Sequence, residues 1–126
     1  MPKISQWFIG SAVIYVIVGM LGGIIMGARQ DFTLAPAHAH LNLIGWVSLA
    51  LMGFYYNANP AKAAGRLALI QFWVSTVGLW IMIPGLVLTL RGEPSGEPIV
   101  IAGSLITLIG MILFATSIFR KVPSLR

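Results

Sequence analysis

Four long apolar segments alternate with three short polar connections along the chain. The apolar segments cover about residues 6–27, 36–56, 67–90 and 99–119. Each is long enough to cross a bilayer as a helix, which takes about 20 apolar residues. No segment shows the period-two alternation that is typical of a barrel strand. The pattern therefore predicts an all-α membrane protein, with four transmembrane helices in one domain over residues 1–126.

The composition supports this class of protein. The chain is 58% hydrophobic and only 9% charged, whereas a soluble domain of this size needs a more polar surface. It contains no cysteine, which excludes disulfides, thiolate metal sites and haem attachment through Cys-x-x-Cys-His. The first apolar segment follows Lys3 as in a signal peptide, but it is too long, and Met26-Gly27-Ala28 is a poor cleavage site. We therefore expect a membrane helix there.

The basic residues predict how the helices are oriented. Those expected on one side of the membrane are Lys3, Lys62, Arg66, Arg120, Lys121 and Arg126. Only Arg29 and Arg91 are expected on the other side, together with all three acidic residues. Because basic residues favour the cytoplasmic side, both termini should be cytoplasmic. The net charge of +5 is then mainly a topology signal, and it requires no nucleic-acid partner.

The predicted spans contain no aspartate, glutamate, lysine or arginine. Small multidrug transporters resemble this chain in size and in number of spans, but they work through a membrane-embedded glutamate, which is missing here.

The first span carries Gly19, Gly23 and Gly27 at four-residue spacing, with Gly22 beside them. Such a ridge allows either another helix or a flat ligand to approach closely.

The only two histidines, His38 and His40, stand at the start of the second span, just after Pro36. Proline suits the first turn of a helix, so both histidines should be helical. At about 100° per residue, positions two apart are separated by about 200° and point to nearly opposite faces. Ligands of a single metal on one helix are usually three or four residues apart. One helix therefore does not easily bring both imidazoles to the same metal.

The two faces of the second span differ in character. The face of His38 includes small and polar residues and continues through Asn42, Gly45, Leu49, Met52 and Tyr56. The face of His40 is uniformly apolar and continues through Leu43, Ile44, Val47, Leu51 and Phe54. If both histidines are ligands, they serve two cavities; otherwise both are interfacial side chains bonded to backbone or water. A complete cofactor site would need ligands from a second chain, because no third histidine exists.

The string AHAHLNLIGWVSLALMGFYY, residues 37–56, resembles a segment of the catalytic subunit of the haem–copper oxidases and nitric oxide reductases. In that superfamily twelve helices form three arcs of four, and a His-x-His pair on one helix binds two haems. The resemblance implies that three copies of this chain form a homotrimer that mimics the twelve-helix subunit. Haem b would then bind between His38 of one protomer and His40 of its neighbour.

The resemblance also implies further cofactor contacts. Outer arginines bind the haem propionates in that superfamily, so Arg29 and Arg91 are candidates, although each is equally an ordinary interfacial arginine. Gly45 would make room for the macrocycle, and Asn42 would donate a hydrogen bond nearby. The chain lacks the histidines that hold the active-site copper, so a complete oxidase is not expected.

The expected function is electron transfer or haem holding in the bacterial inner membrane, with a respiratory electron donor or acceptor as partner. A bis-histidine haem suits one-electron transfer because its ligands need not change. Two other functions remain open. Histidines from several chains would bind copper or zinc, or the protein would be a cofactor-free assembly subunit of a respiratory complex.

Overall fold

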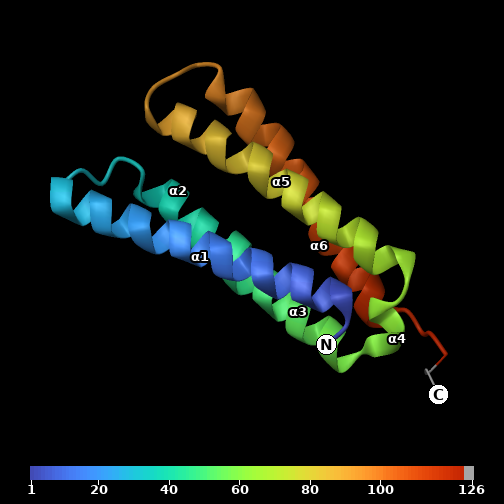
Figure 1. Cartoon of the computed structure of the whole chain (residues 1–126). Coiled ribbons are helices and arrows are strands. Elements are labelled where there is room, and N and C mark those ends of the chain that lie inside the picture. The colour runs from blue at the N-terminus through green and yellow to red at the C-terminus, as the bar shows by residue number, and fades with distance from the viewer. Residues whose placement is uncertain (124–126) are drawn as a thin grey trace.

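The structure is a computed structural model that describes residues 1–123, and helices are its only regular elements in that range (Figure 1). In chain order these are α1 (Lys3–Arg29), α2 (Ala35–His40), η1 (Leu41–Ser48), α3 (Leu49–Ala58), α4 (Pro60–Ala63), α5 (Arg66–Leu90) and α6 (Gly96–Phe119). Because α2, η1 and α3 are continuous, the described residues contain four helices long and apolar enough to cross a membrane. This confirms the predicted all-α class with four spans.

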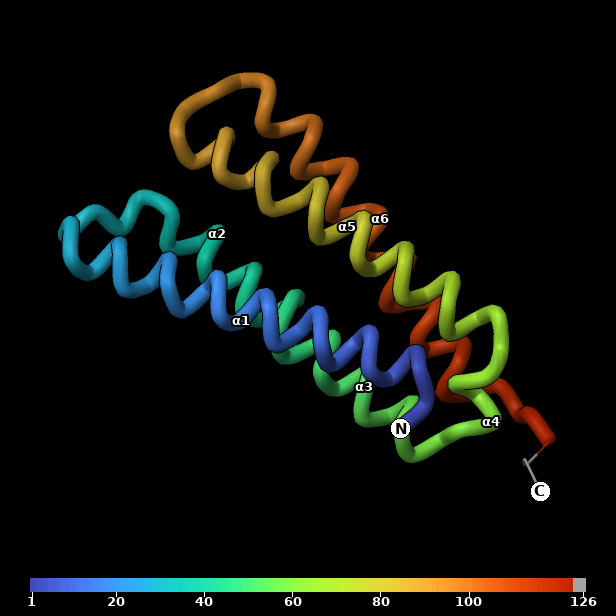
Figure 2. Tube along the Cα trace, viewed as in Figure 1, coloured from blue at the N-terminus to red at the C-terminus, as the bar shows by residue number. Residues whose placement is uncertain are grey.

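The four spans form two antiparallel hairpins, one of α1 with the α2–η1–α3 span and one of α5 with α6 (Figures 1 and 2). The hairpins meet near the N-terminus and α4, which we call the inner end. They diverge toward the α1–α2 and α5–α6 connections, which we call the outer end. Each hairpin therefore packs mainly within itself, and the outer end is left more open.

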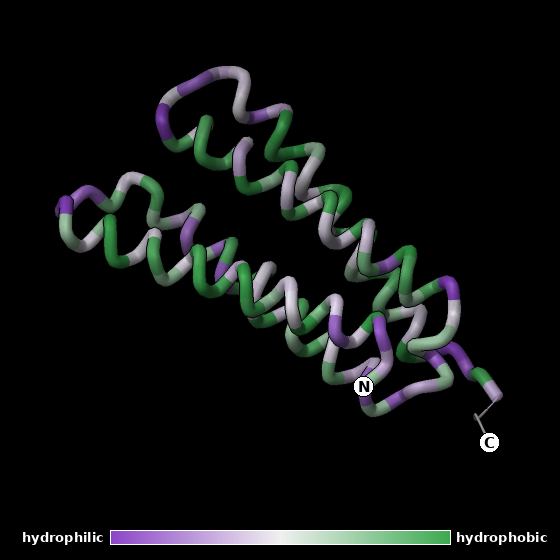
Figure 3. Tube along the Cα trace, in the orientation of Figure 1, coloured by the Kyte–Doolittle hydropathy of each residue, from purple (hydrophilic) through white to green (hydrophobic). Residues whose placement is uncertain are grey.

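Polar residues gather at the two ends of the hairpins (Figure 3). Lys3, Lys62 and Arg66 lie in helices at the inner end, where Arg120 and Lys121 follow α6. At the outer end, Arg29 is the last residue of α1 and Arg91 follows α5. This is the predicted division, except that Arg126 lies outside the described residues. Which end faces the cytoplasm stays a prediction.

Glycines let α5 and α6 pack closely. Along α6 the buried glycines recur every seven residues, which is the spacing of a continuous helix–helix seam. A Cβ on Gly103 would overlap the backbone of Met82, and one on Gly78 would lie 2.8 Å from the backbone nitrogen of Thr107. The glycines of this seam are Gly78 and Gly85 on α5, and Gly96, Gly103 and Gly110 on α6. Any side chain at these positions would force the two helices apart.

Aromatic side chains join the two hairpins at the inner end. Phe8 of α1 and Tyr56 of α3 are fully buried and stack with ring centroids 5.5 Å apart. Phe72 of α5 meets Phe8 edge-on at 5.1 Å. Each such pair adds about 0.5–1.5 kcal/mol beyond simple burial. The main core of the protein therefore lies at the inner end, where both hairpins contribute to it.

The second span departs from the regular α-helix that its sequence predicts. From Leu41 to Ser48 it is a π-helix, and Ser48 Oγ donates a hydrogen bond of 2.9 Å to the carbonyl of Leu43, five residues earlier. The expected spacing of 100° per residue is therefore wrong within this segment. His38 and His40 lie in the α-helical turn before it, so their predicted separation still applies. Short π-helical segments are often found beside functional sites.

Candidate cofactor site at the outer end

His38 lies on the face of the second span that packs against α1. Its imidazole rests on Gly23, where a Cβ would come within 3.1 Å of the ring carbon Cε1. Asn42, one turn further along, places its Nδ2 atom 3.2 Å from His38 Nε2. His38 Nδ1 and Asn42 Oδ1 are buried and have no hydrogen-bond partner among the described residues. A buried polar atom without a partner costs about 1–3 kcal/mol, so a ligand that reached this pair would stabilise it.

His40 is exposed and lies on the other side of the helix, as the 200° separation predicts. Its Nδ1 atom lies 2.7 Å from the carbonyl oxygen of Pro36. Because a carbonyl only accepts hydrogen bonds, Nδ1 must carry the proton and donate it. In the neutral ring the lone pair is then on Nε2. Histidines that bind metals are commonly held in this way by a backbone carbonyl.

A cavity of about 300 Å³ lies between the hairpins at the outer end, and His38 is part of its lining. Its other walls are mainly apolar and include Ile25 of α1, Leu41 of η1 and Val87 of α5. Gly22 also lines it, and a Cβ built on Gly22 would have no described atom within 4 Å apart from its chain neighbours and the backbone of its own helix. The missing side chain at this position therefore contributes directly to the open space. The volume is at the lower end of the range of about 300–1,000 Å³ that is usual for small-molecule sites.

A smaller cavity of about 180 Å³ adjoins the first one on its outer side. Both Arg29, the last residue of α1, and Arg91, which follows α5, line this cavity. The two cavities share three lining residues, namely Ile25, Met26 and Leu34. The fold thus brings the two predicted outer arginines to the mouth of the cavity that contains His38.

Asp31 also lines the smaller cavity, and its carboxylate is ordered by Thr33. Asp31 Oδ1 accepts a hydrogen bond of 2.6 Å from Thr33 Oγ1 and one of 3.1 Å from the Thr33 backbone N–H. These two bonds lower the pKa of Asp31 below its ordinary value, and the charges of Arg91 and Arg29 lower it further. Two cations and one anion therefore face the mouth, which keeps a net positive charge.

The remaining predicted site residue, Gly45, does not line either outer cavity. It is buried in helix packing, where a Cβ would lie 3.0 Å from Tyr15 Cβ and 3.1 Å from Leu79 Cδ2. Within residues 1–123 there is also no group of three or more histidine, aspartate or glutamate side chains that could hold a bare metal ion. The described chain therefore offers an apolar cavity with one imidazole and a cationic mouth.

Comparisons with protein-family models, with curated proteins and with solved structures give no match to this chain. The resemblance to the oxidase subunit therefore stays a prediction from the sequence.

Two features of the site were not predicted from the sequence. The first is which of these glycines leaves open space: Gly19 and Gly23 pack against Asn42 and His38, whereas Gly22 leaves its side of the cavity open. The second is the bonding of Asp31 to Thr33. Its Asp-x-Thr pattern is typical of a turn in which the carboxylate binds the backbone two residues later, and it could have been recognised.

Proposed function

We propose that this chain is a haem b-binding integral membrane protein related to the catalytic subunit of the haem–copper oxidases. It transfers electrons or holds haem, and it is not a complete oxidase. The observation that supports this most is the pair of adjoining outer cavities. They combine an imidazole, apolar walls and two arginines, and haem combines iron, an apolar ring and two carboxylates at one edge.

The residues present fit such a group. His38 would bind the iron through Nε2, whose lone pair accepts the bond from Asn42 Nδ2; Asn42 would release this nitrogen when the group binds. Arg29 and Arg91 would bind the propionates through charge-assisted hydrogen bonds. Gly22 leaves room beside the imidazole, and the aliphatic walls exclude water. With histidines as its ligands, the bound group would supply one-electron transfer without a change of ligands.

We further propose that the functional unit is a homotrimer. His40 points away from the cavity that contains His38, so it cannot complete that site within its own chain. Its exposure and its donated bond to Pro36 make the Nε2 lone pair available to a neighbouring copy. In the trimer, His38 of one copy and His40 of the next would supply the two ligands of each haem.

Absorption spectra of the protein purified in mild detergent test this proposal. Protein from haem-supplied cells should be red, with a Soret band that sharpens on dithionite reduction. His38→Ala should lose most of the haem. His40→Ala should lose the bis-histidine spectrum but retain some haem, because the cavity and both arginines remain. A colourless wild-type protein would overturn the proposal, and metal analysis would then distinguish a copper or zinc protein from a cofactor-free subunit.

Native mass measurement tests the trimer separately. The haem-loaded protein should contain three copies, and a stable monomer with a bis-histidine spectrum would refute the shared site.

We also infer that both termini are cytoplasmic in a bacterial inner membrane. Because the chain has no cysteine, single variants can be labelled cleanly in intact cells. An impermeant maleimide should label Glu93→Cys and not Lys121→Cys; the reverse result would contradict this orientation.

A further inference from the structure

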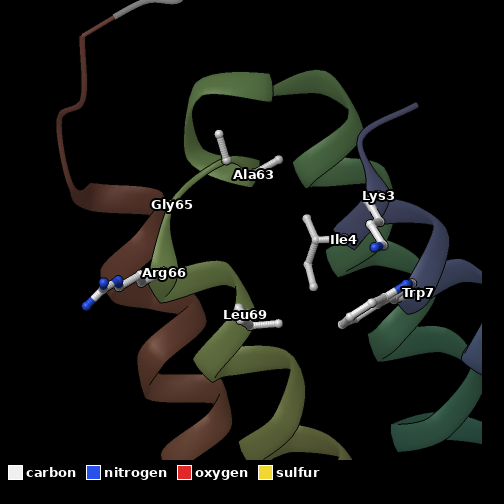
Figure 4. A pocket seen from close by; sticks show the side chains of 8 residues that line it. Lys3, Ile4, Trp7, Ala63, Gly65, Arg66 and Leu69 are labelled. Atoms are coloured by element: carbon white, nitrogen blue, oxygen red, sulfur yellow. The ribbon is translucent and has the colours of Figure 1, made fainter.

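The two ends of the molecule hold cavities of nearly equal volume, about 310 Å³ at the inner end and about 300 Å³ at the outer end. In the inner one, Lys3 lies on the same side as the Trp7 ring, and the Arg66 side chain points away from the space (Figure 4). The outer one is lined by His38, whose ring can bind a metal. The chemistry that sets the outer cavity apart therefore lies in His38 and in the side chain that is bonded to it, Asn42.

Two glycines of α1 make room for this pair of side chains. A Cβ on Gly19 would overlap the amide oxygen of Asn42, and one on Gly23 would come within 3.1 Å of the His38 ring. Glycine carries a hydrogen where that Cβ would stand, so one α-hydrogen of Gly19 points at Asn42 Oδ1. This weak C–H donor suits an oxygen better than it suits the NH₂ group of the amide. The packing therefore favours the orientation in the structure, with Oδ1 toward α1 and Nδ2 toward the His38 ring.

This orientation of the amide determines which nitrogen of the His38 ring carries the proton. An amide nitrogen only donates hydrogen bonds, so His38 Nε2, which lies 3.2 Å from Asn42 Nδ2, must accept with its lone pair. In a neutral imidazole the single proton is then on Nδ1. The other tautomer would place the N–H of Nε2 against the N–H of Nδ2, with no acceptor between the two donors. Asn42 thus selects one of the two neutral forms of the ring.

His40 has the same tautomer for a different reason. Its Nδ1 donates a hydrogen bond of 2.7 Å to the carbonyl of Pro36, which also leaves the lone pair on Nε2. The two rings differ in what surrounds that lone pair: Nε2 of His38 is covered by Asn42, whereas His40 is exposed. Both histidines therefore keep Nε2 free of a proton, and at His38 a side chain must move before a ligand can bind there.

We infer that Asn42 is a positioning residue for His38, with two effects on the same nitrogen. It keeps the proton on Nδ1, so that Nε2 is ready to bind a metal, and it covers Nε2 until the ligand arrives. When a ligand binds at Nε2, the hydrogen bond to Asn42 breaks and no proton leaves the ring. This inference rests on the proposed haem site, because that site gives His38 its role as a ligand. The tautomer itself belongs to the chain alone and can be measured without haem.

Nitrogen NMR of the haem-free protein in detergent, with isotope-labelled histidine, tests the tautomer. The chain has only two histidines, so His40→Ala assigns both sets of ring signals. At a pH of about 8, where an ordinary imidazole is neutral, both rings of the wild type should have a protonated Nδ1 and an unprotonated Nε2. Asn42→Leu removes the donor but keeps a side chain of similar shape. The ratio of the Nδ1–H to the Nε2–H form of His38 should then fall about 2- to 12-fold, the worth of one hydrogen bond.

Asn59→Leu is the matched control for this variant. Asn59 Nδ2 also donates to a partner four residues earlier, the carbonyl of Tyr55, with a bond of 2.8 Å. This bond lies at the inner end of the molecule, away from both histidines. The control should therefore alter the tautomer of neither ring.

A second variant and the His40 signals separate this effect from a loss of folding. Gly19→Ala leaves every polar group in place but puts a methyl group where Asn42 Oδ1 lies, so it should shift the His38 tautomer in the same direction. Unchanged His40 signals show that the turn with Pro36 is intact. A wild-type His38 with its proton on Nε2 would overturn the inference, and so would an unchanged His38 ratio in Asn42→Leu. A colourless protein with the expected tautomers would refute the haem proposal alone, so the two failures are distinguishable.

Discussion

Replacing Gly22 by leucine should fill part of the outer cavity and weaken haem binding without unfolding the protein. Leucine at this position adds four carbons that point into open space. Since a cavity of about 150 Å³ accommodates the six carbons of benzene, four carbons should remove roughly 100 Å³. That is about one third of the cavity of about 300 Å³. A rigid macrocycle cannot shrink to fit the remainder.

The expected loss follows from the cost of overpacking. Forcing an extra side chain into an occupied site costs about 1–3 kcal/mol, and this range corresponds to about 5- to 150-fold in affinity. Haem titration of the apoprotein, followed at the Soret band, measures this loss. The folded apoprotein should be at least as stable as the wild type, because leucine is favoured over glycine in a helix by nearly 1 kcal/mol.

Gly27→Leu is the matched control on the same helix. A Cβ built on Gly27 also meets no described atom within 4 Å beyond its chain neighbours and its own helix backbone, but Gly27 does not line the outer cavities. This variant should bind haem like the wild type and gain similar stability. Equal haem affinity of Gly22→Leu and Gly27→Leu would refute the assignment of the cavity as the haem site. Unfolding of Gly22→Leu alone would show that the space is not open.

Three further predictions concern the mouth of the site and the helix seam. Replacing Arg29 and Arg91 together by glutamine should speed haem loss about 2- to 30-fold, because it removes two exposed ion pairs worth about 0.2–1 kcal/mol each; an unchanged rate of transfer to apomyoglobin would contradict their role. Gly103→Ala should lower the free energy of unfolding in detergent by about 1–3 kcal/mol, since its Cβ has no room, and a wild-type melting curve would disprove the close seam. Thr33→Val should raise the pKa of Asp31 toward its ordinary value by removing the hydroxyl bond. Because the native pKa is lowered, the contribution of Asp31 to stability is present above its ordinary pKa and is lost as the pH falls through the native value; identical carboxyl titrations by NMR would refute this.

The hydrophobic pattern alone determined the class of the protein and the limits of its spans. The largest differences between predicted and observed ends are small, residue 6 against Lys3 and residue 99 against Gly96. This accuracy has a simple cause, because a chain in lipid must satisfy its backbone within each segment and helices do so locally. The opposite directions of His38 and His40 were also predictable, since they depend only on local helix geometry.

The π-helical turn and the pairing into two hairpins were not predictable from the sequence. Gly45 shows the limit clearly: it was expected beside a macrocycle, but Tyr15 and Leu79 occupy the space around it. Glycine on a membrane helix indicates that something comes close, and only the neighbouring helices decide what it is.

The sequence determined which residues could take part in a site, and the tertiary structure decided which of them meet. Arg29 and Arg91 are 62 positions apart (91 − 29), yet they line one cavity because both hairpins end at the same level. Gly22 and Gly23 are neighbours in sequence, yet one faces open space and the other supports the His38 ring. Local propensity acts over a few residues, whereas a cavity is the space that several distant helices leave unfilled between them.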